Sequence, residues 1–249
     1  MLNRQLHPCT GYNWSIGVKM RLLNKITILF VMCLAVLIGC EKTIETEKKV
    51  IDFDRLQERQ GIFYAVNATE PYTGAVIDLY QNGQKMYERN YVGGTRQGLT
   101  ILWFENGQKQ GEGNFVDGKE SGLHTQWYEN GQKESEGNFV DGQRNGRRTM
   151  WFKNGQIMAE GNYANGKEHG LTTMWYDNGQ KKSESNYVDG VLEGLVTSWH
   201  ENGQKEYEIN YVDGKEDGLA NMWDENGKKI REATWVAGEL VDSKDFGEK

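Results

Sequence analysis

Residues 122–145 read GLHTQWYENGQKESEGNFVDGQRN, and this stretch decides the fold. Side chains alternate in character over residues 123–127, which is the two-residue period of a β-strand. Asn130-Gly131 comes next, and because both residue types accept positive φ at low steric cost, the pair predicts a two-residue type I′ turn. Residues 133–140 predict the return strand, and Asp141-Gly142 predicts a second tight turn. The stretch is therefore expected to be a β-hairpin that leads into another hairpin.

The Asn-Gly pair recurs at a step of 24 residues along the chain. It stands at Asn82-Gly83, Asn106-Gly107, Asn130-Gly131, Asn154-Gly155, Asn178-Gly179, Asn202-Gly203 and Asn226-Gly227. Seven such units run from residue 74 to residue 241. Because each unit buries its apolar surface only against its neighbours, the pattern predicts a stacked array and not a single globular core. We expect an all-β fold, an elongated single-layer antiparallel meander of hairpins in the form of a twisted open ribbon.

The expected register assigns side chains to the two faces of the sheet. If Glu129 pairs with Gln132, Trp127 shares a face with Glu136, whereas Lys133 and Phe139 point to the other face. Repetition then builds two aromatic ladders, which we interpret as structural packing. One consists of Trp103, Trp127, Trp151, Trp175, Trp199 and Trp223, and the other of Tyr91, Phe115, Phe139, Tyr163, Tyr187, Tyr211 and Trp235. We also expect a neighbouring ring to lie on the bare backbone of Gly113, Gly137 and Gly161.

One acidic row is a candidate binding site. Its members occupy the same repeat position in all seven units, namely Glu88, Glu112, Glu136, Glu160, Glu184, Glu208 and Glu232. On the Trp face they would form an acidic, aromatic-lined groove for a basic or sugar-bearing partner. The alternative is structural, with each carboxylate paired to a facing Thr or a neighbouring Lys.

The N-terminal segment predicts a lipid anchor. Arg21 and Lys25 precede an apolar run over residues 26–38, which is typical of a signal peptide. The run ends in LIGC at Cys40 and resembles a bacterial lipobox, which implies cleavage before Cys40 and lipid attachment to its sulfur. The alternative is a transmembrane anchor that ends in cysteine by chance. Met20 is the more natural start of such a leader, and residues 1–19 would be an upstream extension.

These patterns divide the chain into segments. We expect a leader and signal peptide over residues 1–39, a lipidated tether over 40–50, a capping hairpin over 51–73, the array, and a polar tail over 242–249. Without the leader, 25 basic and 36 acidic residues give a net charge of −11. Such an acidic body repels nucleic acid, so no nucleic-acid partner is expected.

Sequence patterns for catalysis are missing. The chain has no G-x-S-x-G, no P-loop and no H-E-x-x-H, and the Asp-Gly turns lack the alternating oxygen ligands of a calcium loop. His124, His169 and His200 occupy three different repeat positions, so their spacing forms no metal cluster. We therefore expect a protein that is not an enzyme and has no cofactor or metal.

The repeats resemble MORN repeats. GEGNFVDGKESG at residues 111–122 follows the MORN core, and the preceding W-Y-x-N-G-Q-K, present as residues 127–133, is similar to the bacterial variant type. The resemblance implies a scaffold for protein or lipid contacts, in a group whose members are often named YwqK-family antitoxins.

Three functions remain open after these observations. The preferred one is a lipoprotein of the bacterial cell envelope, held at the outer membrane if the cell is Gram-negative, that serves as a non-catalytic scaffold for an unknown protein or other envelope ligand. The second is an antitoxin that binds its toxin directly, and the third is a carbohydrate or cell-wall binding module. Because near-identical units offer surface and no unique site, partner identity should lie where the units differ.

Overall fold

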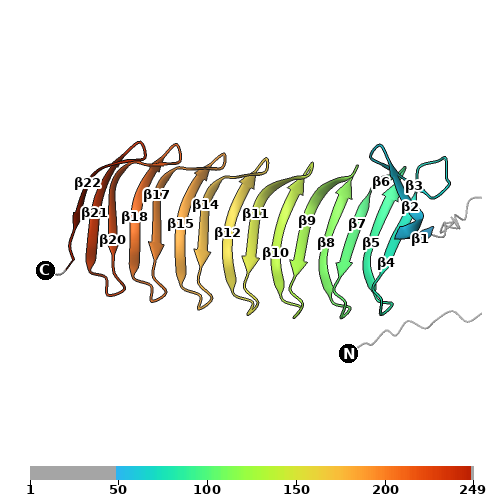
Figure 1. Ribbon diagram of the computed structural model, residues 1–249, viewed down its shortest axis with the longest axis horizontal. Coiled ribbons are helices and arrows are strands. Elements are labelled where there is room, and N and C mark those ends of the chain that lie inside the picture. Colours follow the sequence, from blue (N-terminus) through green and yellow to red (C-terminus); the bar gives the residue numbers. More distant parts are fainter. Residues whose placement is uncertain (1–48, 248–249) are drawn as a thin grey trace, which may run out of the picture. The chain divides into compact units, whose positions relative to one another are not determined.

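The computed structural model describes residues 49–247 (Figure 1), so the leader, Cys40 and most of the tether lie outside the described residues. Within residues 49–247 every regular element is a strand except η1 (Phe53–Arg55), one turn of 3-10 helix. No helix in this part has the length and hydropathy needed to cross a membrane. A sheet of 20 strands accounts for almost all of it.

Seven hairpins follow one another along this sheet. They are β4 (Gly74–Leu79) with β5 (Lys85–Val92), β7 (Gly98–Trp103) with β8 (Lys109–Val116), β9 (Lys119–Trp127) with β10 (Lys133–Val140), β11 (Gln143–Trp151) with β12 (Ile157–Ala164), β14 (Gly170–Trp175) with β15 (Lys181–Val188), β17 (Gly194–Trp199) with β18 (Lys205–Val212), and β20 (Gly218–Trp223) with β21 (Lys229–Val236). Each hairpin pairs antiparallel with the next, so the predicted all-β open meander is confirmed.

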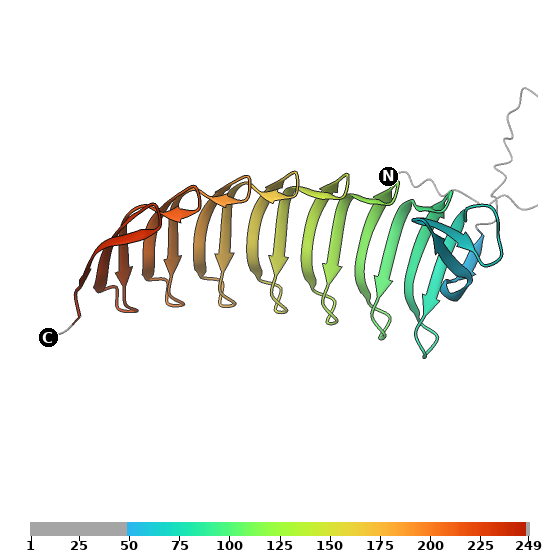
Figure 2. The same cartoon turned by 45° about the horizontal axis from the view of Figure 1, so that its top comes forward.

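The strands bend near the glycine that opens each unit. Gly122 and Gly146 have φ values of 72° and 86°, which L-residues other than glycine adopt only at a cost. The register shifts there by two residues, as between the pairs Glu112↔Thr125 and Asn114↔Ser121. In four units the bend separates a short strand from the long one, giving β6 (Thr95–Arg96), β13 (Lys167–Glu168), β16 (Val191–Leu192) and β19 (Lys215–Glu216). In Figure 2 the ends of the units that contain these short strands turn away from the direction of the long strands.

One of the two predicted tight turns of each unit is confirmed and the other differs. Asp141 and Gly142 have φ values of 50° and 81°, so the Asp-Gly turn has the positive-φ pair of type I′. At the other end Asn130 has no positive φ. There Tyr128 N donates to Gln132 O at 2.8 Å and Gly131 N donates to Tyr128 O at 2.9 Å, which makes a three-residue loop with a left-handed glycine. The predicted type I′ turn at Asn130-Gly131 is therefore wrong.

The side chain of the turn asparagine explains its presence. Asn130 Oδ1 accepts from Gln132 N at 3.1 Å, while Nδ2 donates to Lys153 O of the next unit at 2.8 Å. The same link joins every consecutive pair of units, from Asn82, Asn106, Asn130, Asn154, Asn178 and Asn202 to a carbonyl 23 residues onward. Asparagine at this position therefore connects neighbouring loops, and its own backbone is not left-handed.

A second link runs between units through the residue that follows each tryptophan. Tyr128 Oη donates to Trp151 O at 2.8 Å, and Tyr80 and Tyr176 make the same bond to the next unit. In the sixth unit His200 stands at this position, and its Nε2 lies 2.9 Å from Trp223 O. This departure from the repeat therefore preserves the contact that the tyrosine provides elsewhere.

The densest packing lies at the N-terminal end of the array. There β1 (Val50–Asp52) pairs parallel with β4, and a separate hairpin of β2 (Leu56–Arg59) and β3 (Ile62–Ala65) lies within the segment predicted as a capping hairpin. Tyr72, Val76, Tyr87 and Tyr91 are buried in one cluster, against which Ile51, Leu56 and Phe63 pack. At the other end β22 (Glu239–Asp245) pairs with β21 and includes the first four residues of the expected tail.

Substitution of the left-handed glycine in an Asn-Gly loop should destabilise the array. At Gly155 φ is 87°, and an added Cβ would lie 3.1 Å from Gln132 Oε1. We expect Gly155→Ala to lower the free energy of unfolding by about 1 kcal/mol or more, measured by urea unfolding with tryptophan fluorescence as the signal. Gly137→Ala is the control because its Cβ meets nothing nearer than 3.5 Å and its φ is ordinary. Equal unfolding midpoints for the two variants would contradict this account of the loop.

The cap and the array should respond differently to loss of the same ring. Tyr91 is 1 % exposed in the cap cluster, whereas Tyr187, at the same repeat position, is only half-buried. We expect Tyr91→Ala to lower the free energy of unfolding by about 3–5 kcal/mol, because it leaves a cavity. Tyr187→Ala should lower it by about 1–2 kcal/mol. The comparison uses urea unfolding, and a Tyr187→Ala variant as unstable as Tyr91→Ala would show that the array has a core of comparable density.

Candidate functional site

The tryptophan face is built from contacts between neighbouring units. Lys133 Nζ lies 5.5 Å from the centre of the Trp151 ring, which belongs to the next unit. The same contact places a lysine over Trp103, Trp127, Trp199 and Trp223, at 5.1–5.8 Å. The expectation that Lys133 faces away from the tryptophans is therefore wrong. A bulge at Glu134 pairs Lys133 with Trp127 and Ser135 with Gln126, so the alternation of faces is reset inside each hairpin.

Each glutamate of the candidate row has a basic partner. The ion pairs are Lys85–Glu88, Lys109–Glu112, Lys133–Glu136, Lys181–Glu184, Lys205–Glu208 and Lys229–Glu232. In the remaining unit Ile157 replaces the lysine, and Arg147 binds Glu160 instead. The row thus exists as a spatial row on the tryptophan face, with its charge balanced along its whole length. It is not an open acidic groove.

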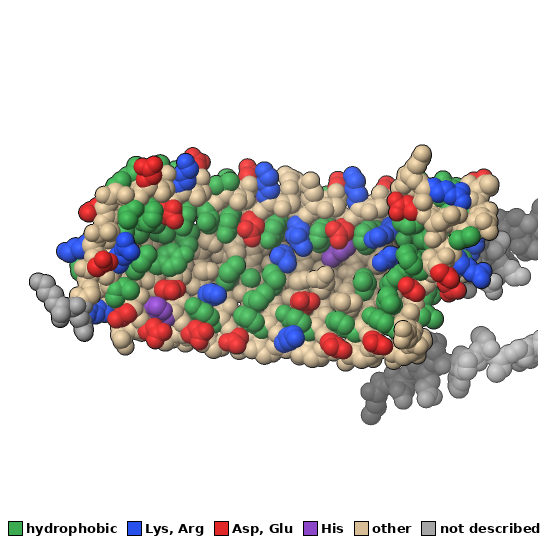
Figure 3. Space-filling view, in the orientation of Figure 1, with side chains coloured by type: hydrophobic (Ala, Val, Ile, Leu, Met, Phe, Trp, Pro, Cys, Tyr) green, Lys and Arg blue, Asp and Glu red, His purple; other side chains and the backbone are tan. Residues whose placement is uncertain are grey.

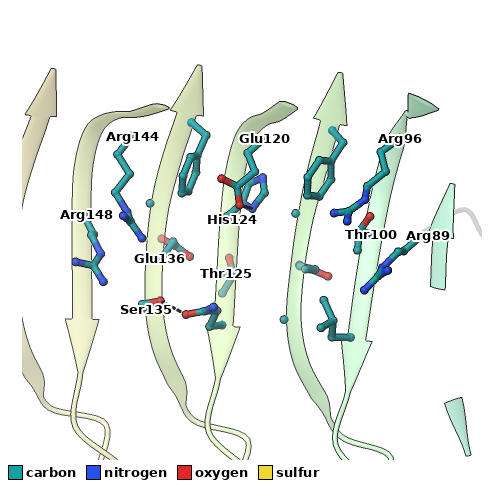
Figure 4. Close-up of a pocket in the computed structure, with 18 residues that line it drawn as sticks. Arg89, Arg96, Thr100, Glu120, His124, Thr125, Ser135, Glu136, Arg144 and Arg148 are labelled. Carbon is teal, nitrogen blue, oxygen red and sulfur yellow. Dashed lines mark hydrogen bonds and ion pairs between the residues drawn. The ribbon is translucent and has the colours of Figure 1, made fainter. Parts of the chain in front are cut away.

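The opposite face holds a different feature, a hollow of about 270 Å³ across β5 to β11. Four of the six arginines within residues 74–241 line it, and we call it the arginine groove. Its basic residues are Arg89, Arg96, Arg144 and Arg148. Figure 4 shows Arg89 and Arg96 at one end, Arg144 and Arg148 at the other, and His124 with Glu120 between them. In Figure 3 basic side chains gather on the face in view near a histidine, over the middle of the array.

Aromatic rings form the wall of the arginine groove between its ends. The His124 ring lies between those of Phe115 and Phe139, with centroids 5.7 Å and 4.7 Å away. The Arg96 guanidinium stands 5.1 Å from the Phe115 centroid and that of Arg144 stands 5.3 Å from Phe139. Stacking of this kind orients the guanidinium planes and leaves their N–H groups free to donate.

Missing side chains create the hollow. A Cβ at Gly113 would lie 2.2 Å from His124 Nδ1, so the imidazole rests directly on the backbone of β8, as expected for a ring at this position. Gly137 and Gly161 differ from that expectation, because the Arg148 stem and the Thr172 hydroxyl lie over them. From the sixth unit onward, Ile209 and Ala233 fill the corresponding position and belong to a small apolar cluster.

The electrostatics of the arginine groove are unbalanced within residues 49–247. None of its four arginines forms an ion pair with a carboxylate in this part of the chain, although the body is acidic overall. Three glutamates also line the arginine groove. Glu120 lies 3.6 Å from His124 Nδ1, while Glu112 and Glu136 form ion pairs with Lys109 and Lys133 of the tryptophan face.

Two polar atoms at the arginine groove are buried without a partner in the described part of the chain. They are Thr100 Oγ1, on a residue only 5 % exposed, and Arg89 Nε. Arg89 also stacks on Tyr87 at 4.0 Å. Burial raises the pKa of Tyr87 to about 12, even though the charge of Arg89 lowers it. A buried polar atom without a hydrogen-bond partner is costly, so these two atoms destabilise this part of the array.

The sequence left the arginine groove unnoticed because its residues share no repeat position. Arg89, Arg96 and Arg148 occupy three different places in the unit, and only Arg96 and Arg144 correspond. A search for periodicity finds residues that recur at the same repeat position, whereas these arginines lie at positions where the units differ. A search for residue types that concentrate in a few neighbouring units would have found them.

Possible metal ligands lie apart from one another in the described part of the chain. Among residues 49–247 no three His, Cys, Asp or Glu side chains form a group that could hold a metal ion. His124 contacts Asn114 O at 3.0 Å, His169 lies 3.8 Å from Asp189, and His200 contacts Trp223 O. These three histidines therefore make different contacts, and they occupy different repeat positions.

A double-mutant cycle tests the structural role of the acidic row. Glu136 and Lys133 are both partly exposed, so Lys133→Gln and Glu136→Gln should show a coupling of about 0.2–1 kcal/mol in urea unfolding, lost at about 1 M salt. Lys153→Gln combined with Glu136→Gln is the control pair and should show none. A coupling above about 2 kcal/mol that survives salt would mean that the pair is shielded from solvent by some other group.

Comparison with known families agrees with the geometry. A family model described as a MORN repeat variant matches five tandem windows, at residues 96–117, 120–141, 144–165, 168–189 and 192–213. The hairpins β4–β5 and β20–β21 lie outside these windows and have the same strand pairing. No curated protein matches the chain. Repeats of this family suggest a scaffold or binding module, and the family is not known as catalytic. The chain therefore carries a tandem array of MORN-variant repeats, arranged as an open β-sheet.

Proposed function

We propose that this protein is a non-catalytic scaffold, anchored to the bacterial cell envelope by lipid on Cys40, that binds a protein partner in the arginine groove. The observation that carries the binding role is a set of four arginines on one face of an otherwise acidic array, none of them ion-paired to a carboxylate within residues 49–247. A surface whose charges are all balanced internally gains little from a charged partner, whereas unbalanced charge favours one.

The anchor rests on the sequence. The apolar run over residues 26–38 ends in Gly39-Cys40, directly before a charged segment. The first described strand, β1, begins at Val50, ten residues after Cys40. A lipidated cysteine with this short spacer would hold the array close to the membrane surface, and two or three acyl chains give stable attachment.

The two faces of the array suit different tasks. On the tryptophan face every glutamate of the row is paired and every described Trp–Lys contact joins two units, so the side chains there hold the array together. On the other face the side chains of the first four units diverge and create a hollow. Recognition of a specific partner requires such divergence, because identical units present identical surfaces.

The carbohydrate and antitoxin alternatives have less support among the described residues. Sugar-binding arrays offer pairs of open rings, but here the tryptophans of the ladder are half-buried and five of the six lie beneath a lysine. No described feature distinguishes a toxin from any other protein partner.

The anchor can be tested by substitution of its sulfur. Cells that express the full chain should incorporate an alkyne-labelled fatty acid into it and retain it in the membrane fraction. Cys40→Ser should lose the label and move the protein out of that fraction, while Cys33→Ser, inside the apolar run, should do neither. Membrane retention of an unlabelled Cys40→Ser protein would contradict lipid anchoring and favour a transmembrane segment.

Site-specific photocrosslinking in native membranes tests the binding role. A benzophenone amino acid at Gln126 would lie at the arginine groove, and one at Leu123, on the same strand, would lie on the opposite face, where the leucine is 51 % exposed. We expect a discrete protein adduct from position 126 and none from position 123. Adducts from both positions, or from neither, would contradict a partner held in the arginine groove.

A further inference from the structure

We infer that the arginine groove binds an acidic peptide segment of the partner, with two Asp or Glu side chains about six residues apart and apolar side chains between them. The inference rests on the proposed function and names the chemistry of its partner. Guanidinium groups present a planar fork of donors that matches a carboxylate in a bidentate geometry. The four arginines of the arginine groove have no such acceptor within residues 49–247.

The spacing of the two basic ends sets the spacing of the acidic groups. Arg96 belongs to the strand that continues as β7, and Arg144 to β11, and four antiparallel pairings separate them, β7–β8, β8–β9, β9–β10 and β10–β11. At the ordinary distance between strands this is about 19 Å, and an extended peptide advances about 3.3 Å per residue. A peptide that crosses the strands therefore reaches from one end to the other with about six residues.

The middle of the arginine groove favours apolar side chains over a continuous row of negative charges. Phe115 and Phe139 line it between the basic ends, together with Leu102. Glu120 also lies there, beside His124, and its carboxylate opposes further negative charge at the centre. Nucleic acids and polyphosphates carry a charge at every unit and would place some of them against Glu120. A peptide can place carboxylates at the ends and apolar groups on the rings.

The test measures binding of a synthetic peptide to the purified full chain by fluorescence anisotropy. The probe carries two aspartates about six residues apart, a leucine midway, and glycine and serine elsewhere. Comparison probes replace both aspartates by asparagine, move them to adjacent positions, or substitute inorganic polyphosphate for the peptide. We expect the first probe to bind best, and its affinity to fall as salt rises.

Neighbouring arginines on β11 provide a matched control. Arg148 lines the arginine groove, whereas Arg147 binds Glu160 on the opposite face, so Arg148→Gln and Arg147→Gln remove the same charge from the same strand. Arg148→Gln and Arg96→Gln should each weaken binding about ten-fold, and Arg147→Gln less than about two-fold. Arg148→Lys keeps the charge without the fork and should also weaken binding, which provides a folded variant if the glutamine substitution destabilises β11.

Three results would overturn the inference. They are equal binding of the aspartate and asparagine probes, equal loss from Arg147→Gln and Arg148→Gln, and tighter binding of polyphosphate than of the peptide. In any of these cases a photocrosslinked adduct from position 126 would still support a protein partner in the arginine groove, with a different chemistry of recognition. Peptide binding without such an adduct in membranes would instead contradict the proposed function.

Discussion

Every unit of this protein depends on the hydrogen bonds that it makes to the next one. The strands pair from hairpin to hairpin, and an asparagine in each of the first six loops donates to a carbonyl 23 residues onward. In four units a tyrosine or histidine adds a second hydrogen bond to a carbonyl 23 residues onward. A single hairpin has no such partner and is marginal in water, so stability belongs to the interfaces between units.

This arrangement explains why one end is packed so much more densely than the rest. An open sheet leaves its first strand without a neighbour, and exposed strand edges invite pairing with other chains. Here β1 and the hairpin β2–β3 lie against the first unit and bury Tyr72, Val76 and Tyr91. The far end relies on β22, whose side chains are all exposed. The N-terminal end of the array is therefore densely packed, whereas the strand at the C-terminal end buries no side chain.

The same constraint separates structural from functional positions. Side chains that must meet their counterparts in the next unit are kept constant, as with the lysine that covers each following tryptophan and pairs with its own glutamate. When one member changes, the contact is rebuilt from elsewhere, as Arg147 does for Glu160 beside Ile157. Positions that make no contact with the next unit vary, and on one face of the first four units their variation produces the arginine groove.

The sequence by itself determined the β-hairpin repeat, its length, its open antiparallel meander and the presence of an acidic row, because strand alternation and glycine-containing turns are local properties. It did not determine which turn needs left-handed backbone, since the asparagine side chain serves the next unit and not its own φ. Nor did it place Lys133 on the correct face, because a bulge shifts the register inside each hairpin. Only the tertiary structure brought Arg89, Arg96, Arg144 and Arg148 together, since their proximity comes from the lateral pairing of strands far apart in the chain and from the bend at each opening glycine.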